Sequence, residues 1–168
     1  MNRQIVSAAC GLWLGLSGAA LAQGTEAVVV VELYTSQGCS SCPPADAYLA
    51  RLADQPGVMP LALHVDYWDY IGWADSFAQP KFTDRQRAYA AASGSRTIYT
   101  PQMVVNGVDL AVGSDEVTVN GQIRRHLDAV ATVALQVTRT GKTLAISAQA
   151  LAAVPGPLRV QLVRYAPS

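Results

Sequence analysis

Two cysteines separated by two residues are the side chains best suited to chemistry in this 168-residue chain. Cys39 and Cys42 stand where an apolar run gives way to an amphipathic one, so we expect them at a junction between a strand and a helix. Thiols at this spacing can close a small reversible disulfide, and the positive end of a helix dipole favours a thiolate. We therefore predict that Cys39 is the nucleophile, and that the more shielded Cys42 resolves the mixed disulfide.

Other kinds of site are also compatible with a cysteine pair. A structural zinc site needs four ligands, and beyond Cys42 the chain offers only His64 and His126, far apart in sequence, so we expect no zinc site and no cofactor. A purely structural disulfide in such a short ring would constrain little chain entropy. Two alternatives stay open: a module in which both thiolates, with or without His64, hold copper(I), and a non-catalytic scaffold that docks partners through its C-terminal strands.

The first residues predict export. Residues 1–22 contain Arg3, an apolar run and Ala20-Leu21-Ala22, the pattern of a secretory signal. Cys10 lies within this segment, so its removal leaves Cys39 and Cys42. In an exported chain, a single pair of this kind indicates catalysis or redox sensing rather than a structural cross-link. We expect a periplasmic or secreted protein without a membrane span in its mature part.

Composition and length limit the remaining possibilities. Half of the residues are apolar (51%) and the formal net charge is zero, so the chain lacks the basic character typical of proteins that bind nucleic acid. The length allows one domain of about 100 residues and a smaller attachment. We place the first at residues 23–131 and a β-strand domain at 132–168.

The elements around the cysteines predict an α/β fold. Residues 28–34 form a continuous β-branched run, typical of a strand buried on both faces. Pro43 and Pro44 suit the first turn of the helix that follows. Residues 59–65 alternate as a second strand, which completes a parallel strand, helix, strand unit.

A carboxylate interrupts the first strand. Glu32 has two interpretations of equal weight: a buried acceptor for the proton of Cys42, or a glutamate that reaches water or pairs with an arginine. In the second strand, His64 and Asp66 lie on the face opposite the apolar side chains, where they could touch.

The loop over residues 66–75 is rich in aromatic and acidic residues. Tyr67 and Trp68 would form a partner-binding lip beside the thiols, or else would anchor the loop to the core. A helix follows, with either Pro80 at its first position or residues 83–86 as a capping box. We expect Arg85 on its solvated face.

The second half predicts a hairpin, a helix and further strands. A proline leads into a short strand, Asn106-Gly107 turns the chain, and a helix is expected over 120–130 with Val130 inward. The alternating segments 133–137, 144–148 and 158–162 predict three antiparallel strands with one apolar face.

With these pieces in place, the chain resembles the thioredoxin superfamily over about residues 27–131. Two features carry the likeness: Cys39-Ser40-Ser41-Cys42 after a strand, and Thr100-Pro101 before a later strand. The resemblance implies a thioredoxin-like fold with a helical insertion, followed by a small antiparallel β extension. It also implies that Pro101 is cis and packs against the dithiol, and that Thr100 contacts substrate.

Within that superfamily, the later motifs look like those of glutaredoxin. Thr100-Pro101-Gln102 is followed by Asn106-Gly107 and then by Gly113-Ser114-Asp115. This likeness implies that Thr100, Gly113, Ser114 and Asp115 hold a glutathione-like peptide, so glutathione joins protein and small-thiol substrates as a possible partner.

The whole mature chain is most similar to a family of secreted bacterial thioredoxin-like proteins, domain-of-unknown-function family 1223. The stretches that carry this resemblance are residues 33–46 and 64–69. Members of that family run longer, so we leave open whether the strands of 132–168 form a complete β-sandwich.

Overall fold

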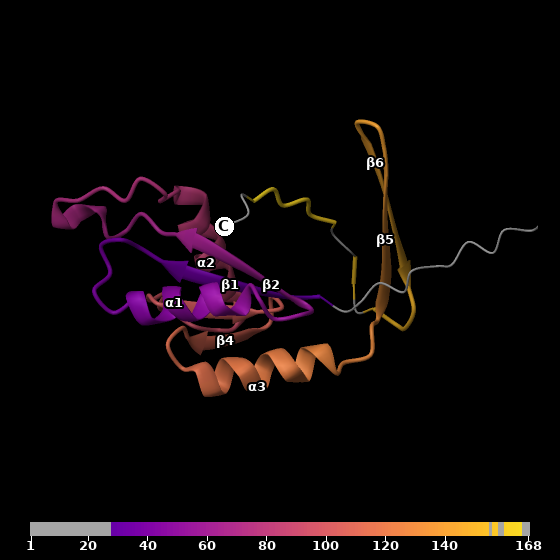
Figure 1. Ribbon diagram of the computed structural model, residues 1–168, viewed down its shortest axis with the longest axis horizontal. Coiled ribbons are helices and arrows are strands. Elements are labelled where there is room, and N and C mark those ends of the chain that lie inside the picture. Colours follow the sequence, from indigo (N-terminus) through magenta and orange to yellow (C-terminus); the bar gives the residue numbers. More distant parts are fainter. Residues whose placement is uncertain (1–27, 155, 158–159, 166–168) are drawn as a thin grey trace, which may run out of the picture.

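A computed structural model describes residues 28–154, 156–157 and 160–165 of the chain. The predicted signal sequence, with Cys10, lies outside the described residues. The elements, shown in Figure 1, are β1 (Val29–Thr35), α1 (Pro43–Leu52), β2 (Val58–His64), a short 3-10 helix η1 (Asp69–Ile71), α2 (Pro80–Ala92), β3 (Gln102–Val105), β4 (Asp109–Val112), α3 (Glu116–Leu127), β5 (Val133–Thr140) and β6 (Thr143–Ala150).

A four-stranded mixed sheet in the order β2-β1-β3-β4 forms the centre of the fold. β1 pairs in parallel with β2 across the α1 connection, which confirms the predicted strand, helix, strand unit. β3 lies antiparallel to β1 on its other side, and β4 returns antiparallel to β3. The buried, β-branched sequence of β1 follows from this central position, because strands cover both of its edges and helices cover both of its faces.

The helices divide between the two faces of the sheet. α1 and α3 cover one face, where Leu33 and Met103 pack against Leu49 and Ile123. α2 covers the other face, where Tyr34 and Val104 belong to a second apolar cluster. Alternate residues of β1 therefore face different helices, so a shift of one position changes the surroundings of a side chain completely.

Two helix boundaries differ in detail from those predicted. α2 starts at Pro80, and the alternative capping box is not formed because the Thr83 hydroxyl donates to Asp66. α3 starts at Glu116, earlier than predicted, because Asp115 accepts the Thr118 N–H and caps the helix there. It ends at Leu127, so the prediction that Val130 points inward was wrong, since Val130 is 91% exposed.

The C-terminal residues form a separate two-stranded sheet. β5 and β6 make an antiparallel hairpin that stands away from the main sheet (Figure 1). A third strand was expected at 158–162, but the described residues 160–165 are not in a strand, and 158–159 lie outside the described part. Among the described residues, no helix is sufficiently long and apolar to span a membrane.

Candidate functional site

Cys39 and Cys42 form a disulfide, with their sulfur atoms 2.07 Å apart, in the connection between β1 and α1. Cys42 is the residue that precedes the helix, and its carbonyl accepts the N–H groups of Ala45 and Asp46. Pro43 begins the first turn, where no hydrogen-bond donor is needed. Cys42, rather than Cys39 as expected, therefore occupies the capping position, and the disulfide lies at the positive end of α1.

The disulfide is closed off from solvent. Cys39 is 3% exposed and Cys42 is completely buried, so the sulfur that we expected to be reachable is covered in this oxidised form. Cys39 remains the nearer of the two to the surface, and its sulfur lies 3.5 Å from the hydroxyl oxygen of Ser41. Any attack on Cys39 therefore requires its cover to open.

Pro101 forms one wall beside the disulfide helix. The Thr100–Pro101 peptide bond is cis, the geometry that the resemblance implied. The Gly113 N–H donates to the Pro101 carbonyl, and a Cβ added to Gly113 would lie 3.0 Å from Pro101 Cβ and 3.1 Å from Ala45 Cβ. Leu33 Cδ1 lies at the same point, also at 3.0 Å. The first turn of α1, β1 and the Pro101 loop therefore meet where no side chain fits, which explains the glycine.

Trp68 joins the disulfide loop to the Pro101 loop. Its indole N–H donates to the Thr100 hydroxyl over 2.8 Å, and a Cβ on Gly38 would lie 3.1 Å from Trp68 Cβ and 3.0 Å from Ile71 Cδ1. Trp68 thus connects the residue before Cys39 with the residue before Pro101. Tyr67, which we grouped with it, turns toward α2 instead, where its hydroxyl donates to Gln86.

A histidine and a buried aspartate adjoin the same loop. Asp75 Oδ2 lies 2.6 Å from His64 Nδ1 and 2.8 Å from the backbone nitrogen of Gln37. The expected contact between His64 and Asp66 is not formed, because Asp66 accepts the Thr83 hydroxyl. Burial opposes ionisation of Asp75, but hydrogen bonds from Gln37, His64 and Phe77 outweigh it and hold the pKa of the carboxyl below its usual value.

Glu32 lies on the opposite face of the sheet, toward α2. Its oxygens accept two hydrogen bonds of 2.7 Å from Arg85 and one each from Tyr34 and Tyr89. This is the arginine pairing, one of the two interpretations that the sequence left open, and it corrects the expected solvated position of Arg85. Burial next to Glu32 raises the pKa of Tyr34, and raises that of Tyr89 to about 12.

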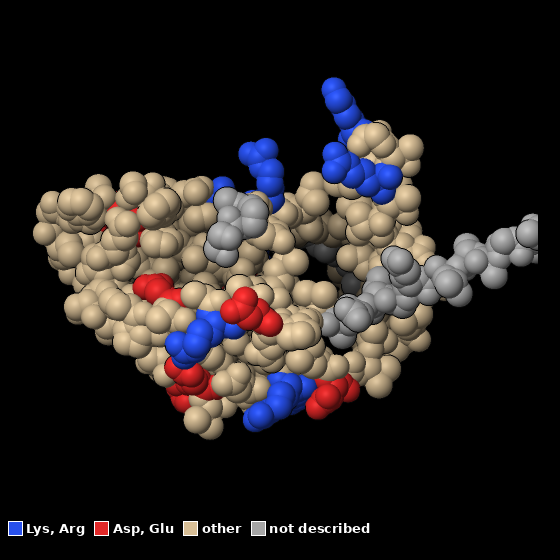
Figure 2. Space-filling model, in the orientation of Figure 1, with Lys and Arg blue, Asp and Glu red and all other residues tan. Residues whose placement is uncertain are grey.

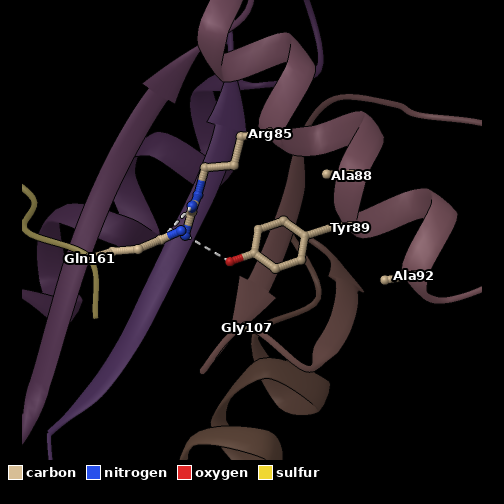
Figure 3. A pocket seen from close by; sticks show the side chains of 6 residues that line it. All are labelled: Arg85, Ala88, Tyr89, Ala92, Gly107 and Gln161. Atoms are coloured by element: carbon tan, nitrogen blue, oxygen red, sulfur yellow. Dashed lines mark hydrogen bonds between the residues drawn. The ribbon is translucent and has the colours of Figure 1, made fainter. Parts of the chain in front are cut away.

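Beside this ion pair is a pocket of about 310 Å³. Figure 3 shows the Arg85 and Tyr89 side chains of α2 in it, together with Gln161 from the C-terminal segment. Gln161 lies 3.4 Å from Arg85, a weak contact. The guanidinium is engaged by Glu32 already, so the pocket presents little unbalanced charge.

The 66–79 loop, which contacts Gly38 next to Cys39, carries exposed aromatic and apolar side chains. The exposed fractions of the largest are 80% for Tyr70, 63% for Trp73, 61% for Phe77 and 49% for Ile71. Figure 2 shows few charged side chains at the end of the molecule where this loop lies, on the left of the view. The partner-binding lip was predicted from Tyr67 and Trp68 alone, although the density of aromatic residues was a signal for the others.

The predicted site residues therefore separate into two groups. Cys39 and Cys42 form the disulfide, Pro101 and Gly113 meet the first turn of its helix at Ala45, and Trp68 contacts both Thr100 and Gly38. Glu32 and Tyr67 lie toward α2. Ser114 and Asp115 are exposed after β4, where the Asp115 carboxylate is engaged by Thr118.

One form of the copper alternative adds His64 to the two sulfurs. Among the described residues, no group of three or more His, Cys, Asp or Glu side chains is placed to hold a metal ion. His64 is engaged by Asp75 instead.

Comparison with known proteins adds a family and a solved relative. The chain is similar to the family described as "Protein of unknown function (DUF1223)" over residues 30–168. It is also similar to a crystal structure of a protein from Agrobacterium tumefaciens, with 44% identity and a TM-score of 0.62. The similarity covers 72% of this chain but only 56% of that protein, so the solved relative extends well beyond the shared part. No curated protein shows significant similarity. Since the family match includes both cysteines, the Trp68 loop and the hairpin, the chain belongs to the DUF1223 family.

Proposed function

We propose that this protein is an exported thiol–disulfide oxidoreductase with a thioredoxin-like fold. The observation that carries the proposal is a disulfide at the N-terminus of a helix whose first turn meets Pro101 and Gly113. A structural disulfide would not need this arrangement, and in such a short ring it would constrain little chain entropy.

The reaction is an exchange of two electrons between dithiol and disulfide. The Cys39 thiolate attacks one sulfur of the partner's disulfide, so that a bond from Cys39 to the partner forms and the other partner sulfur leaves as a thiolate. Cys42 then loses its proton and attacks the Cys39 sulfur, which re-forms the intramolecular disulfide and releases the second partner thiolate. The partner gains two electrons, and the reverse sequence oxidises it.

The walls of the site favour a polypeptide as partner. Thr100 and Trp68 lie on one side of the disulfide, and the exposed side chains of Tyr70, Trp73 and Phe77 extend the surface beyond it. Aromatic side chains at this density suit a protein segment better than a small anionic thiol. Glutathione is the second candidate, held by Thr100, Gly113, Ser114 and Asp115.

Export is part of the proposal and rests on the sequence of residues 1–22, whose pattern is that of a secretory signal. An oxidising compartment contains disulfide-bonded proteins, with which a single cysteine pair can exchange its disulfide.

The test is to trap the mixed disulfide in variants that keep Cys10→Ser throughout. Cys42→Ser removes the resolving sulfur, so after reduction and addition of a disulfide-linked peptide we expect a stable adduct on Cys39, identified by mass spectrometry. Oxidised glutathione, added in a parallel sample, distinguishes the two partner classes.

Cys39→Ser is the matched control, because it retains one cysteine in the same loop and should form far less adduct. If folded Cys42→Ser forms no adduct with either disulfide, the oxidoreductase proposal is wrong.

A further inference from the structure

The His64 imidazole and the disulfide loop share one carboxylate oxygen. Asp75 Oδ2 accepts from His64 Nδ1 over 2.6 Å and from the Gln37 N–H over 2.8 Å, two residues before Cys39. His64 is also the last residue of β2. It pairs in register with Thr35, the last residue of β1 before the disulfide loop. The histidine is therefore fixed to the segment that carries the nucleophile.

The carboxylate fixes which ring nitrogen can exchange a proton. The Asp75 side chain is 1% exposed, and its other oxygen accepts the Phe77 N–H. Because an ionised carboxylate only accepts hydrogen bonds, Nδ1 of His64 carries the hydrogen. Nε2 makes no hydrogen bond within the described residues, and the His64 side chain is 21% exposed. A carboxylate that orients an imidazole in this way leaves Nε2 as an acid or base.

β1 places no carboxylate on the face that carries the disulfide helix, and Asp46 of α1 is engaged by the Thr35 hydroxyl. Leu33 is the β1 residue that meets Pro101 and Ala45 on that face, and it is fully buried. Glu32 lies on the other face with Arg85. Exchange at Cys39 nevertheless needs a group that accepts the proton of the thiol.

We propose that His64, held by Asp75, is the base that takes up the proton lost by Cys39. This inference rests on the proposed function. Reduction of the disulfide adds two electrons and two protons and gives two thiols. When Cys39 then ionises, His64 Nε2 gains the proton, so no net charge is lost, and the resulting imidazolium favours the thiolate.

The other charged groups of this network are acidic. Asp69 accepts the Asp75 N–H, Asp46 of α1 accepts the hydroxyl of Thr35, and Asp66 accepts that of Thr83. The Phe77 ring covers one side of His64 at 5.3 Å between ring centres. None of these groups changes its oxidation state, so a difference in the titration of His64 between the oxidised and the reduced protein reports on the sulfurs.

The chain contains a matched control. It has two histidines, and the second, His126, also lies 2.6 Å from an aspartate oxygen, that of Asp109. Asp109 begins β4, whereas the Gly113 end of that strand adjoins Pro101, so this pair lies at the far end of the sheet.

The experiment is an NMR titration of both imidazoles in the full chain carrying Cys10→Ser, in the oxidised state and after reduction with dithiothreitol. If the imidazolium stabilises the thiolate, the thiolate raises the pKa of His64 by the same free energy. We expect the His64 midpoint to rise on reduction by about half a pH unit or more, with that of His126 unchanged. Equal midpoints in the two states, or equal shifts of both histidines, would overturn the inference.

A second measurement follows the sulfur. With Cys10→Ser and Cys42→Ser in place, the rate of Cys39 alkylation by iodoacetamide is recorded against pH. Adding His64→Gln should move its midpoint upward by about one pH unit, while adding His126→Gln should not. An unchanged midpoint with His64→Gln would count against the inference. Neither measurement needs a partner, so these results are separate from the adducts that decide the proposed function.

Discussion

Glu32 and Asp75 are both buried carboxylates, yet each is balanced in a different way. A guanidinium and two phenols surround Glu32, whereas two backbone N–H groups and an imidazole surround Asp75. A buried charge is costly unless such partners are present. The first arrangement holds α2 to the sheet, and the second holds the disulfide loop to the loop after β2.

Replacing Arg85 with methionine tests the first arrangement. The variant should lower the free energy of unfolding by about 3 kcal/mol, because it leaves the Glu32 carboxylate buried without its cation. Urea unfolding followed by circular dichroism measures the change. Adding Glu32→Gln should recover part of the loss, and a double variant no more stable than Arg85→Met would contradict this account of the pair.

Asp75→Asn tests the second arrangement through pH. The pKa of Asp75 is lowered in the folded protein, so its contribution to stability is present above the ordinary carboxyl pKa and is lost as the pH falls through the folded value. We expect a loss of about 2 kcal/mol at neutral pH that shrinks below about pH 4. Asp84→Asn is the control, because that side chain is 72% exposed and should change little. A loss independent of pH would show that the charge of Asp75 is not the cause.

At the scale of the elements, β1, α1 and the Pro101 loop meet at Gly113 and leave no room there for a side chain. The three contacts that an added methyl group would make are at 3.0 to 3.1 Å, and they come from three separate segments. None of these segments can move without the others. The position of the disulfide helix relative to Pro101 is therefore set by direct packing.

Gly113→Ala should lower stability by about 1 to 3 kcal/mol, since the methyl group must displace Leu33, Pro101 or Ala45. Gly121→Ala in α3 is the matched substitution, because a Cβ there meets nothing within 4 Å. It should leave stability unchanged or raise it by up to about 1 kcal/mol. Thermal melts of both variants measure the difference, and equal effects would mean that Gly113 is not tightly packed.

The 66–79 loop packs against Gly38, the residue before Cys39. Ile71 contacts Gly38 and is 49% exposed, so truncating it removes about 1 kcal/mol of contact. If opening precedes attack, Ile71→Ala should speed reduction of the disulfide by dithiothreitol about fivefold. Val117→Ala, at an 84% exposed position in α3, is the control. No acceleration would mean that another part of the protein covers Cys39.

At the scale of the whole molecule, the β5–β6 hairpin and the α/β part are built differently. Leu135, Val137, Leu144 and Ile146 of the hairpin are 39 to 58% exposed, whereas the α/β part has fully buried residues on both faces of its sheet. A two-stranded sheet with an open apolar face gains little stability by itself.

Ile146→Ala should therefore change the main unfolding transition by less than about 0.5 kcal/mol. Ile123→Ala, the same substitution at a fully buried position of α3, should cost about 2 to 5 kcal/mol. Fluorescence of Trp68 and Trp73, which lie in the α/β part, monitors that transition. A large effect of Ile146→Ala would show that the hairpin contributes to the stability of the α/β part.

The sequence predicted local features well and contacts across the sheet less well. The strands around the cysteines and the turn at Asn106-Gly107 follow from apolar periodicity and turn chemistry, which are properties of neighbouring residues. The pairing of Glu32 with Arg85 joins residues far apart in the chain, and no local pattern specifies it. The packing of the 66–79 loop on Gly38 escaped prediction for the same reason, because that loop follows the next strand.

The packing at Gly113 has a consequence for how the protein would adapt to new partners. The side of the disulfide helix that meets Pro101 has no spare room, so even a single methyl group at Gly113 would disturb it. The 66–79 loop, by contrast, carries aromatic side chains that are exposed at the surface. If the proposed function is right, changes in partner choice should therefore accumulate in residues 66–79, while Gly113 tolerates almost no variation.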